Sequence, residues 1–151
     1  IDPADLCISK GKLAWVLYCD LICLDDDGSI LDVAVIALMT ALKSVRLPKI
    51  DYDVDTKVIK VKDDEEKVPL NLKCLPVAST FMIFEKNYLL VDPTADEENI
   101  CDTSVTISTC DGKFNYIYQP GGNALESSQF DAAIKQALNR EKYIKSLINV
   151  E

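Results

Sequence analysis

Histidine is absent from this chain of 151 residues. Its absence excludes the Ser-His and Cys-His arrangements that activate a nucleophile. It also leaves thiolates as the only soft ligands for a zinc site of the usual kind. The six cysteines contain no Cys-x-x-Cys pair, so we expect reduced, packed thiols rather than a metal site or disulfides. Any catalysis would therefore depend on carboxylates, lysines or a metal held by carboxylates.

Basic residues are scarce as well. The chain has 16 Lys and Arg against 25 Asp and Glu, a net charge of −9 and a pI near 4.5. Affinity for nucleic acid comes largely from Lys and Arg that displace counterions from phosphates. The chain alone is therefore not expected to be a phosphate-binding surface, and if RNA is involved, other chains should make most of the contacts.

No basic leader with a short apolar core precedes the polar opening IDPADLCISKGK, so we expect neither a secretory signal nor a membrane span. That favours an intracellular protein. A hydrophobic content of 48% and a mean hydropathy of +0.06 are sufficient for one core or for two small subdomains.

The longest apolar stretch begins at Leu13. Only Asp20 is charged between Leu13 and Leu24, which predicts a long strand covered on both faces. Few other segments could flank such a strand, so the chain is expected to be a fragment of a larger domain. The two cysteines of this predicted strand, Cys19 and Cys23, would lie on the same face but too far apart to form a disulfide.

A helix is predicted after the acidic turn of residues 25–28. Ser29 can accept a hydrogen bond from a free amide of the first turn, and Asp32 lies near the positive end of the helix dipole. Lys43 and Arg46 lie near the negative end, and Pro48 stops the helix. Apolar side chains on almost every side predict a helix that is buried nearly all round.

The second half predicts short antiparallel strands and a closing helix. Residues 51–67 form a charged connector in which KVIKVK, residues 57–62, could be an exposed edge strand. Beyond Val68, β-branched and aromatic segments are separated by turns at Lys86-Asn87 and Asp111-Gly112, the latter suited to a tight hairpin. The final segment has apolar residues at helical spacing, with Ser127 or Ser128 as the N-cap. Those apolar residues are Phe130, Ile134, Ala137, Leu138, Ile144, Leu147 and Ile148.

An acidic loop, Asp92 to Glu98, follows an apolar strand. Acids at the end of a buried strand can converge on magnesium, which prefers oxygen ligands. A loop of solvated acids is the alternative, and an acidic protein offers such clusters by chance.

Three segments carry a family resemblance: WVLYCDLICLDDDGSILDVAVIALMTALKSVRLP, LPVASTFMIFEKNYLLVDPTADEEN and QPGGNAL. They resemble the later part of an RNase PH-type domain, in particular the non-catalytic RNase PH-like subunits of the eukaryotic exosome ring. The resemblance implies an α+β fold whose N-terminal portion is missing here. Residues 1–50 would end a first, βαβ subdomain, 51–67 would connect, and 68–151 would form a second subdomain with an antiparallel sheet and helices.

The resemblance also implies a function. Such units form a hexameric ring with cap proteins on one face, and RNA passes through the channel toward a separate nuclease. The expected partners are therefore other RNase PH-like subunits, cap proteins and RNA, with no membrane and no cofactor. The expected locations are nucleus, nucleolus and cytoplasm. The expected role is a scaffold for 3′–5′ RNA decay and rRNA processing.

Site residues follow from the same resemblance. Active relatives place an arginine after a Gly-Ser or Gly-Thr step to grip the attacking phosphate, whereas Gly28-Ser29 is followed here by Ile30. They also hold magnesium with two aspartates six residues apart, where this chain has Asp92 and Glu98. We therefore expect Gly28, Ser29 and Ile30 to form a degenerate phosphate site, and Asp92 and Glu98 to be vestigial metal ligands. No catalytic residue is expected. A phosphorolytic 3′–5′ exoribonuclease is the alternative, and a free-standing interaction domain is a third possibility.

Overall fold

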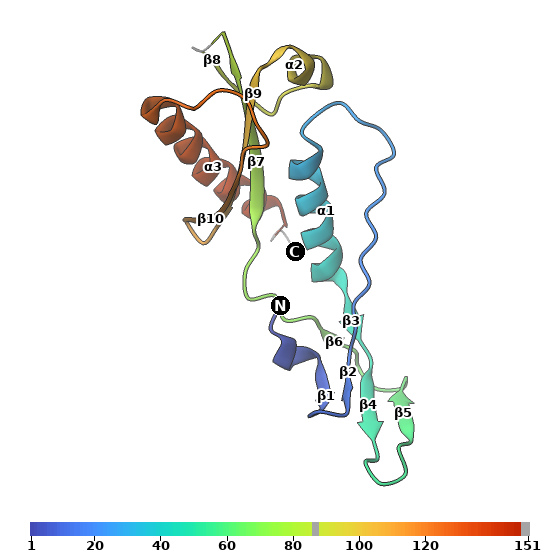
Figure 1. The fold of residues 1–151 in the computed structure, drawn as a ribbon. Coiled ribbons are helices and arrows are strands. Elements are labelled where there is room, and N and C mark those ends of the chain that lie inside the picture. The colour runs from blue at the N-terminus through green and yellow to red at the C-terminus, as the bar shows by residue number, and fades with distance from the viewer. Residues whose placement is uncertain (86–87, 149–151) are drawn as a thin grey trace. The chain divides into compact units, whose positions relative to one another are not determined.

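The computed structural model describes residues 1–85 and 88–148 (Figure 1). The chain divides into two compact units. The first contains Ile1–Asp20 and Thr40–Cys74, and the second contains Leu21–Met39 and the chain from Leu75 onward. The predicted subdomains, divided at residues 50 and 68, are consecutive stretches of sequence. The two compact units are defined by spatial contact, so they do not test those boundaries, which stay predictions. Among the described residues, no helix is both long and apolar enough to cross a membrane.

The first unit consists of a short 3₁₀ helix and small antiparallel pairs. The helix is Pro3–Leu6 and the pairs are β1 (Cys7–Ser9) with β2 (Leu13–Ala14), β3 (Arg46–Leu47) with β6 (Val68–Pro69), and β4 (Lys49–Tyr52) with β5 (Ile59–Lys62). The strand predicted within KVIKVK is confirmed as β5, and it is mostly exposed. Lys62 lies 3.0 Å from Asp51 and 3.2 Å from Glu65, so its charge is matched locally.

The second unit contains a four-stranded antiparallel sheet in the order β10-β9-β7-β8. Its strands are β7 (Val77–Phe84), β8 (Tyr88–Val91), β9 (Thr103–Cys110) and β10 (Lys113–Tyr118). The antiparallel strands expected in this half are confirmed. The predicted turn at Lys86-Asn87 lies outside the described residues.

Helix α3 (Ser127–Ile148) closes the chain as predicted and packs on the sheet. The core joins β7, β9 and α3 through Phe81, Val105, Ile107, Ala133 and Ala137. The N-cap prediction was wrong by one or two residues. Glu126 precedes the helix: its carbonyl accepts from the Phe130 amide, and its own amide donates to the Gln129 side chain.

The Asp111-Gly112 hairpin turn is confirmed between β9 and β10. Both residues have positive φ, +53° and +73°, as a tight hairpin requires. The Gly112 amide donates to the buried Glu141 carboxylate at 3.3 Å, and Lys145 lies 2.8 Å from both Asp111 and Glu141. These contacts raise the pKa of Lys145 despite partial burial, so the turn is held to α3 by charge.

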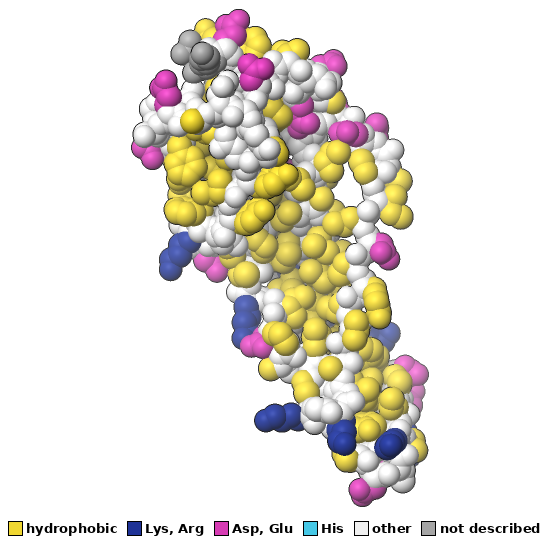
Figure 2. Space-filling view, in the orientation of Figure 1, with side chains coloured by type: hydrophobic (Ala, Val, Ile, Leu, Met, Phe, Trp, Pro, Cys, Tyr) yellow, Lys and Arg dark blue, Asp and Glu magenta, His cyan; other side chains and the backbone are white. Residues whose placement is uncertain are grey.

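Helix α1 (Ile30–Ser44) is confirmed, but its predicted burial on all sides is wrong. Asp32, Met39 and Leu42 are buried, whereas Leu31 is 49% and Val33 61% exposed. Figure 2 shows hydrophobic side chains at the surface in this region. An apolar pattern predicts that a face can be buried, but burial requires a neighbouring element, and none described here covers this one.

The prediction of a long buried strand from Leu13 to Leu24 is also wrong. Only Leu13–Ala14 of the predicted Leu13–Leu24 strand is paired, and Tyr18 is 89% and Leu24 95% exposed. Extended backbone becomes a sheet strand only beside a partner, and no described strand pairs with residues 15–24. Cys19 and Cys23 are exposed rather than packed, and all six cysteines are unbridged.

The core predicts a sharp contrast between two phenylalanines. Phe81 is fully buried, whereas Phe114 on the edge strand β10 is 57% exposed. Phe81→Ala should lower the free energy of unfolding by about 3 to 5 kcal/mol, because it removes apolar contacts and leaves a cavity. Phe114→Ala is the matched control and should cost less than about 1 kcal/mol. Urea denaturation measures both, and equal losses would contradict this description of the core.

Candidate functional site

The start of α1 meets the acidic loop that follows β8. The Ser29 amide donates a hydrogen bond to Glu98 Oε1 at 2.8 Å, and the Ser29 hydroxyl donates to the Pro93 carbonyl at 3.2 Å. Ser29 is buried, with 5% exposure. The first helical amides, those of Asp32 and Val33, donate to the Ser29 backbone carbonyl, and the contact seen for the hydroxyl is with Pro93 rather than the predicted cap. The structure thus brings together Ser29 of the predicted phosphate site and Glu98 of the predicted metal site.

The acidic loop is shaped by a turn and a helix cap. Asp92 takes a φ of +59°, which turns the chain after β8 toward the buried Pro93. Thr94 then caps α2 (Ala95–Ile100): its hydroxyl accepts from the Glu97 amide, and the Glu97 carboxylate accepts from the Thr94 amide. This reciprocal cap fixes the first turn of α2, and therefore the position of Glu98.

Gly28 is the residue that allows the two loops to approach. Its φ is +86°, and a Cβ added there would lie 2.3 Å from the Pro93 carbonyl oxygen and 2.6 Å from the Thr94 carbonyl carbon. Only glycine fits both the backbone conformation and the space. The glycine of the predicted phosphate site is thus required for packing against the acidic loop.

Ile30 supplies no polar group to this site. It is 44% exposed and lines a mostly apolar hollow at the start of α1, whose rim also includes Asp25 and Asp27. The other apolar residues that line this hollow are Leu21, Ile22, Cys23, Leu24, Val33, Ala34 and Ala37. The position where active relatives are expected to carry arginine is therefore part of an apolar surface.

A buried carboxylate lies in the first turn of the helix. Asp32 is fully buried and accepts from the Thr80 amide at 2.9 Å and from the Thr80 hydroxyl at 2.8 Å. Because that hydroxyl donates to Asp32, the Thr106 hydroxyl, 2.9 Å away, donates to Thr80. Arg140 of α3 lies 3.4 Å from Asp32. Burial raises the pKa of Asp32, while the contacts with Thr80 and Arg140 oppose that rise.

The two predicted metal ligands have different partners. Asp92 is 60% exposed and lies 3.6 Å from Arg140, whereas Glu98 accepts from Ser29. A magnesium site would need these oxygens to share a cation, and here each faces a donor of the protein. Within the part of the chain that the structure describes, no group of three or more acidic or cysteine residues is placed to hold a metal.

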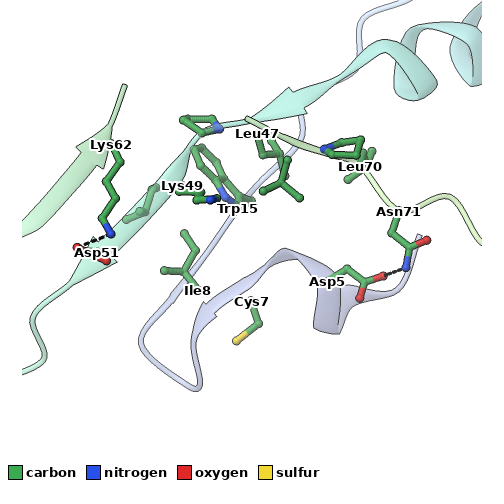
Figure 3. Close-up of a pocket in the computed structure, with 14 residues that line it drawn as sticks. Asp5, Cys7, Ile8, Trp15, Leu47, Lys49, Asp51, Lys62, Leu70 and Asn71 are labelled. Atoms are coloured by element: carbon green, nitrogen blue, oxygen red, sulfur yellow. Dashed lines mark hydrogen bonds and ion pairs between the residues drawn. The ribbon is translucent and has the colours of Figure 1, made fainter. Parts of the chain in front are cut away.

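A separate hollow lies in the first unit (Figure 3). Trp15, Ile8, Leu47 and Leu70 are among its lining residues. Most of its charged and amide side chains have partners: Asn71 donates to Asp5 at 3.0 Å, Asp51 pairs with Lys62, and Lys49 pairs with Glu65. The lining of this hollow is therefore partly apolar, and these polar groups are engaged within the protein.

Asp32, Thr80 and Arg140 form one network that the sequence pattern does not predict. Asp32 was interpreted only through the helix dipole. Two signals were available: Asp32 is a single acid in a strongly apolar helix, and Arg140 is one of only two arginines in the chain. A buried acid requires a partner. Their proximity, however, depends on the tertiary fold.

Comparison with known proteins identifies the family. Residues 4–48 match the model of domain 1 of the 3′ exoribonuclease family, and residues 74–140 match domain 2. The chain belongs to the RNase PH-like family. The exosome complex component Rrp42 of Pyrococcus furiosus is 33% identical over 142 residues, which cover 93% of this chain and 50% of that protein. Rrp42 of Methanosarcina acetivorans is 32% identical over 97% of this chain and 52% of that protein.

Solved structures agree with this RNase PH-like assignment. An Archaeoglobus fulgidus exosome with RNA bound to the active site superposes with a TM-score of 0.67 at 28% identity, over 83% of this chain and 46% of that one. Rice Rrp46, with a TM-score of 0.56, 16% identity and coverage of 84% and 49%, shares the fold. The predicted α+β, RNase PH-like fold class is confirmed. The chain spans about half the length of the relatives that it matches.

The network around Arg140 predicts unequal effects of its two ion pairs. Arg140→Met should destabilise the protein by about 2 to 3 kcal/mol, because it leaves Asp32 buried without a charge partner. Adding Asp32→Asn should recover at least about 1 kcal/mol. Asp92→Asn is the control and should change stability by less than about 1 kcal/mol, because Asp92 is largely exposed. Denaturation of the wild type, Arg140→Met, Asp32→Asn, the double variant and Asp92→Asn measures the coupling, and strictly additive effects of the Asp32 and Arg140 changes would contradict it.

Proposed function

We propose that this chain is part of a non-catalytic scaffold subunit of the exosome ring, which supports 3′–5′ RNA processing and degradation. The supporting observation is the state of the predicted phosphate site. Ile30 replaces the expected arginine, and the neighbouring Ser29 amide is bonded to Glu98. The relatives named as exosome components, and the archaeal exosome core structures, support the assignment to the ring.

Charge is the main argument against catalysis. Phosphorolysis requires donors that hold the attacking phosphate and stabilise the charge on the transferred group. Arg140 lies between the carboxylates of Asp32 and Asp92, and Arg46 donates to the backbone carbonyls of Lys43 and Val45. Both arginines of the chain therefore have other partners, and the net charge is −9.

The alternative is a phosphorolytic 3′–5′ exoribonuclease. Asp92 favours it, because this residue is exposed at the end of a strand and keeps the acidic character of the metal site in active relatives. The segment Gln119-Pro120-Gly121-Gly122 counts against it, since it departs from the Gln-Gly-Thr-Ala-Glu-Gly run of active members. A scaffold role requires neither a phosphate-binding arginine nor a metal site. It is therefore consistent with both Ile30 and the altered Gln119–Gly122 segment.

The finer assignment is to the non-catalytic RNase PH-like subunits of eukaryotes, close to the one also called Opa-interacting protein 2. We propose that the partners are other RNase PH-like subunits of a hexameric ring, cap proteins and RNA that passes through the ring. A role in rRNA processing, and a location in nucleus, nucleolus and cytoplasm, belong to the same proposal.

The exposed apolar residues support a role in assembly. Val16, Tyr18, Ile22 and Leu24 are each at least 65% exposed, and none of them pairs with a strand of the part of the chain that the structure describes. An exposed apolar segment of this kind can pair with a strand of another chain or domain. An interface formed in this way would depend on apolar area more than on charge.

The first test is catalytic. Full-length protein should release no nucleoside diphosphates from single-stranded RNA in a phosphate-dependent manner. Ile30→Arg alone should not create activity, because groups at a catalytic site act as a unit and Glu98 stays on Ser29. Turnover by the wild-type protein that is abolished by Asp92→Asn would establish the exoribonuclease alternative.

The second test concerns assembly. Full-length protein should co-purify with another RNase PH-like ring subunit at low salt and at about 1 M salt alike, because screening weakens charge pairs and leaves apolar contacts largely intact. Tyr18→Asp should weaken this association, whereas Tyr143→Asp, on the exposed side of α3, is the matched control and should not. A monomer that retains none of the ring subunits would refute the scaffold assignment.

A further inference from the structure

The start of a helix is a natural position for an anion. Its first amides lack helical partners, and the helix dipole places positive potential there. Phosphates and carboxylates therefore bind readily at such ends. At the start of α1, the Ser29 amide is already occupied, because it donates to Glu98 Oε1 at 2.8 Å. The anion in this position is a side chain of the protein itself.

The contact between Glu98 and Ser29 is held from both sides. On the α1 side, Ser29 also donates through its hydroxyl to Pro93, and Gly28 packs against the backbone of Pro93 and Thr94. On the α2 side, the Glu98 amide donates to the Thr94 carbonyl at 2.9 Å. Glu98 thus projects from a fixed turn toward a fixed amide.

The neighbouring acids do not share this role. The Glu97 carboxylate accepts from the Thr94 amide as part of the helix cap. Asp96 lies in the same first turn of α2 and is exposed. Among the acids of this helix, Glu98 is the one that reaches α1, which makes Asp96 a matched control for a change at Glu98.

We infer that Glu98 is an internal anion that occupies the start of α1 and keeps inorganic phosphate away from the Ser29 amide. Two negative groups cannot share one amide donor, so phosphate would have to displace a carboxylate that is held at the site by the fold. The contact is therefore autoinhibitory toward anion binding. An arginine at position 30 would meet a site whose anion position is filled.

This inference rests on the proposed function, since it gives a physical cause for the loss of phosphate binding at that site. Its test measures anion binding and amide exchange, which do not depend on RNA turnover or on assembly. Failure of this inference is therefore distinguishable from failure of the proposed scaffold function.

The experiment is rescue of the full-length protein by inorganic phosphate. Glu98→Ala should lower Tm by roughly 2 to 4 °C, because the Ser29 amide loses its acceptor. Phosphate, compared with chloride at equal ionic strength, should raise the Tm of Glu98→Ala by at least about 2 °C more than that of the wild-type protein. Asp96→Ala should respond to phosphate as the wild type does. Glu98→Gln keeps an acceptor oxygen and should also gain nothing from phosphate.

Hydrogen exchange at Ser29 supplies the independent readout. The amide should exchange slowly in the wild type and in Glu98→Gln, faster in Glu98→Ala, and slowly again in Glu98→Ala with phosphate. Equal exchange in Glu98→Ala and the wild type would overturn the inference. So would an equal effect of phosphate on Tm in all four proteins. If Glu98→Ala does not fold, a specific response of Glu98→Gln to phosphate would overturn it as well.

Discussion

The buried contact between Asp32 and Thr80 fixes the start of α1 against the central strand of the sheet. Asp32 is fully buried, and both of its oxygens accept hydrogen bonds from Thr80. A buried carboxylate is tolerated only where donors surround it. Thr80 donates both hydrogen bonds and Arg140 forms an ion pair at 3.4 Å, so these contacts tie the first turn of α1 to the sheet and to α3. Ser29 precedes that turn, so the contacts of Asp32 act together with the Ser29–Pro93 bond and the packing of Gly28 to place the Ser29 amide beside Glu98.

Each charged group at the candidate site has a partner within the protein. Arg140 lies between Asp32 and Asp92, and Glu98 accepts from the start of α1. A phosphate-binding site needs the reverse, donors and positive charge without an internal partner. The same residues that resemble a degenerate catalytic site thus act as contacts that join α1, α2, α3 and the sheet. Gly28, Asp92 and Glu98 therefore each have a structural role that requires no chemistry.

Turn residues and apolar periodicity correctly predicted the elements that depend mainly on neighbouring residues in the sequence. The Asp111-Gly112 hairpin, the antiparallel strands and α3 follow from positive-φ turn residues and apolar periodicity, and all are present. The strand at Leu13–Leu24 and the complete burial of α1 depend on neighbours that a periodic pattern cannot supply, and neither is present. The family resemblance identified Ser29, Asp92 and Glu98, but their partners depend on the fold. Arg140 is far from Asp32 in the sequence, and only the tertiary structure places the two side chains together.

We infer that the start of α1 holds the protein's own Glu98 carboxylate and is closed to phosphate. The most direct measurement is a high-resolution structure of the full-length protein, alone or in its complex, determined in phosphate buffer. We predict that Glu98 Oε1 lies within hydrogen-bond distance of the Ser29 amide and that no phosphate contacts this amide. Density for phosphate on the Ser29 amide, with the Glu98 side chain turned away, would contradict the claim.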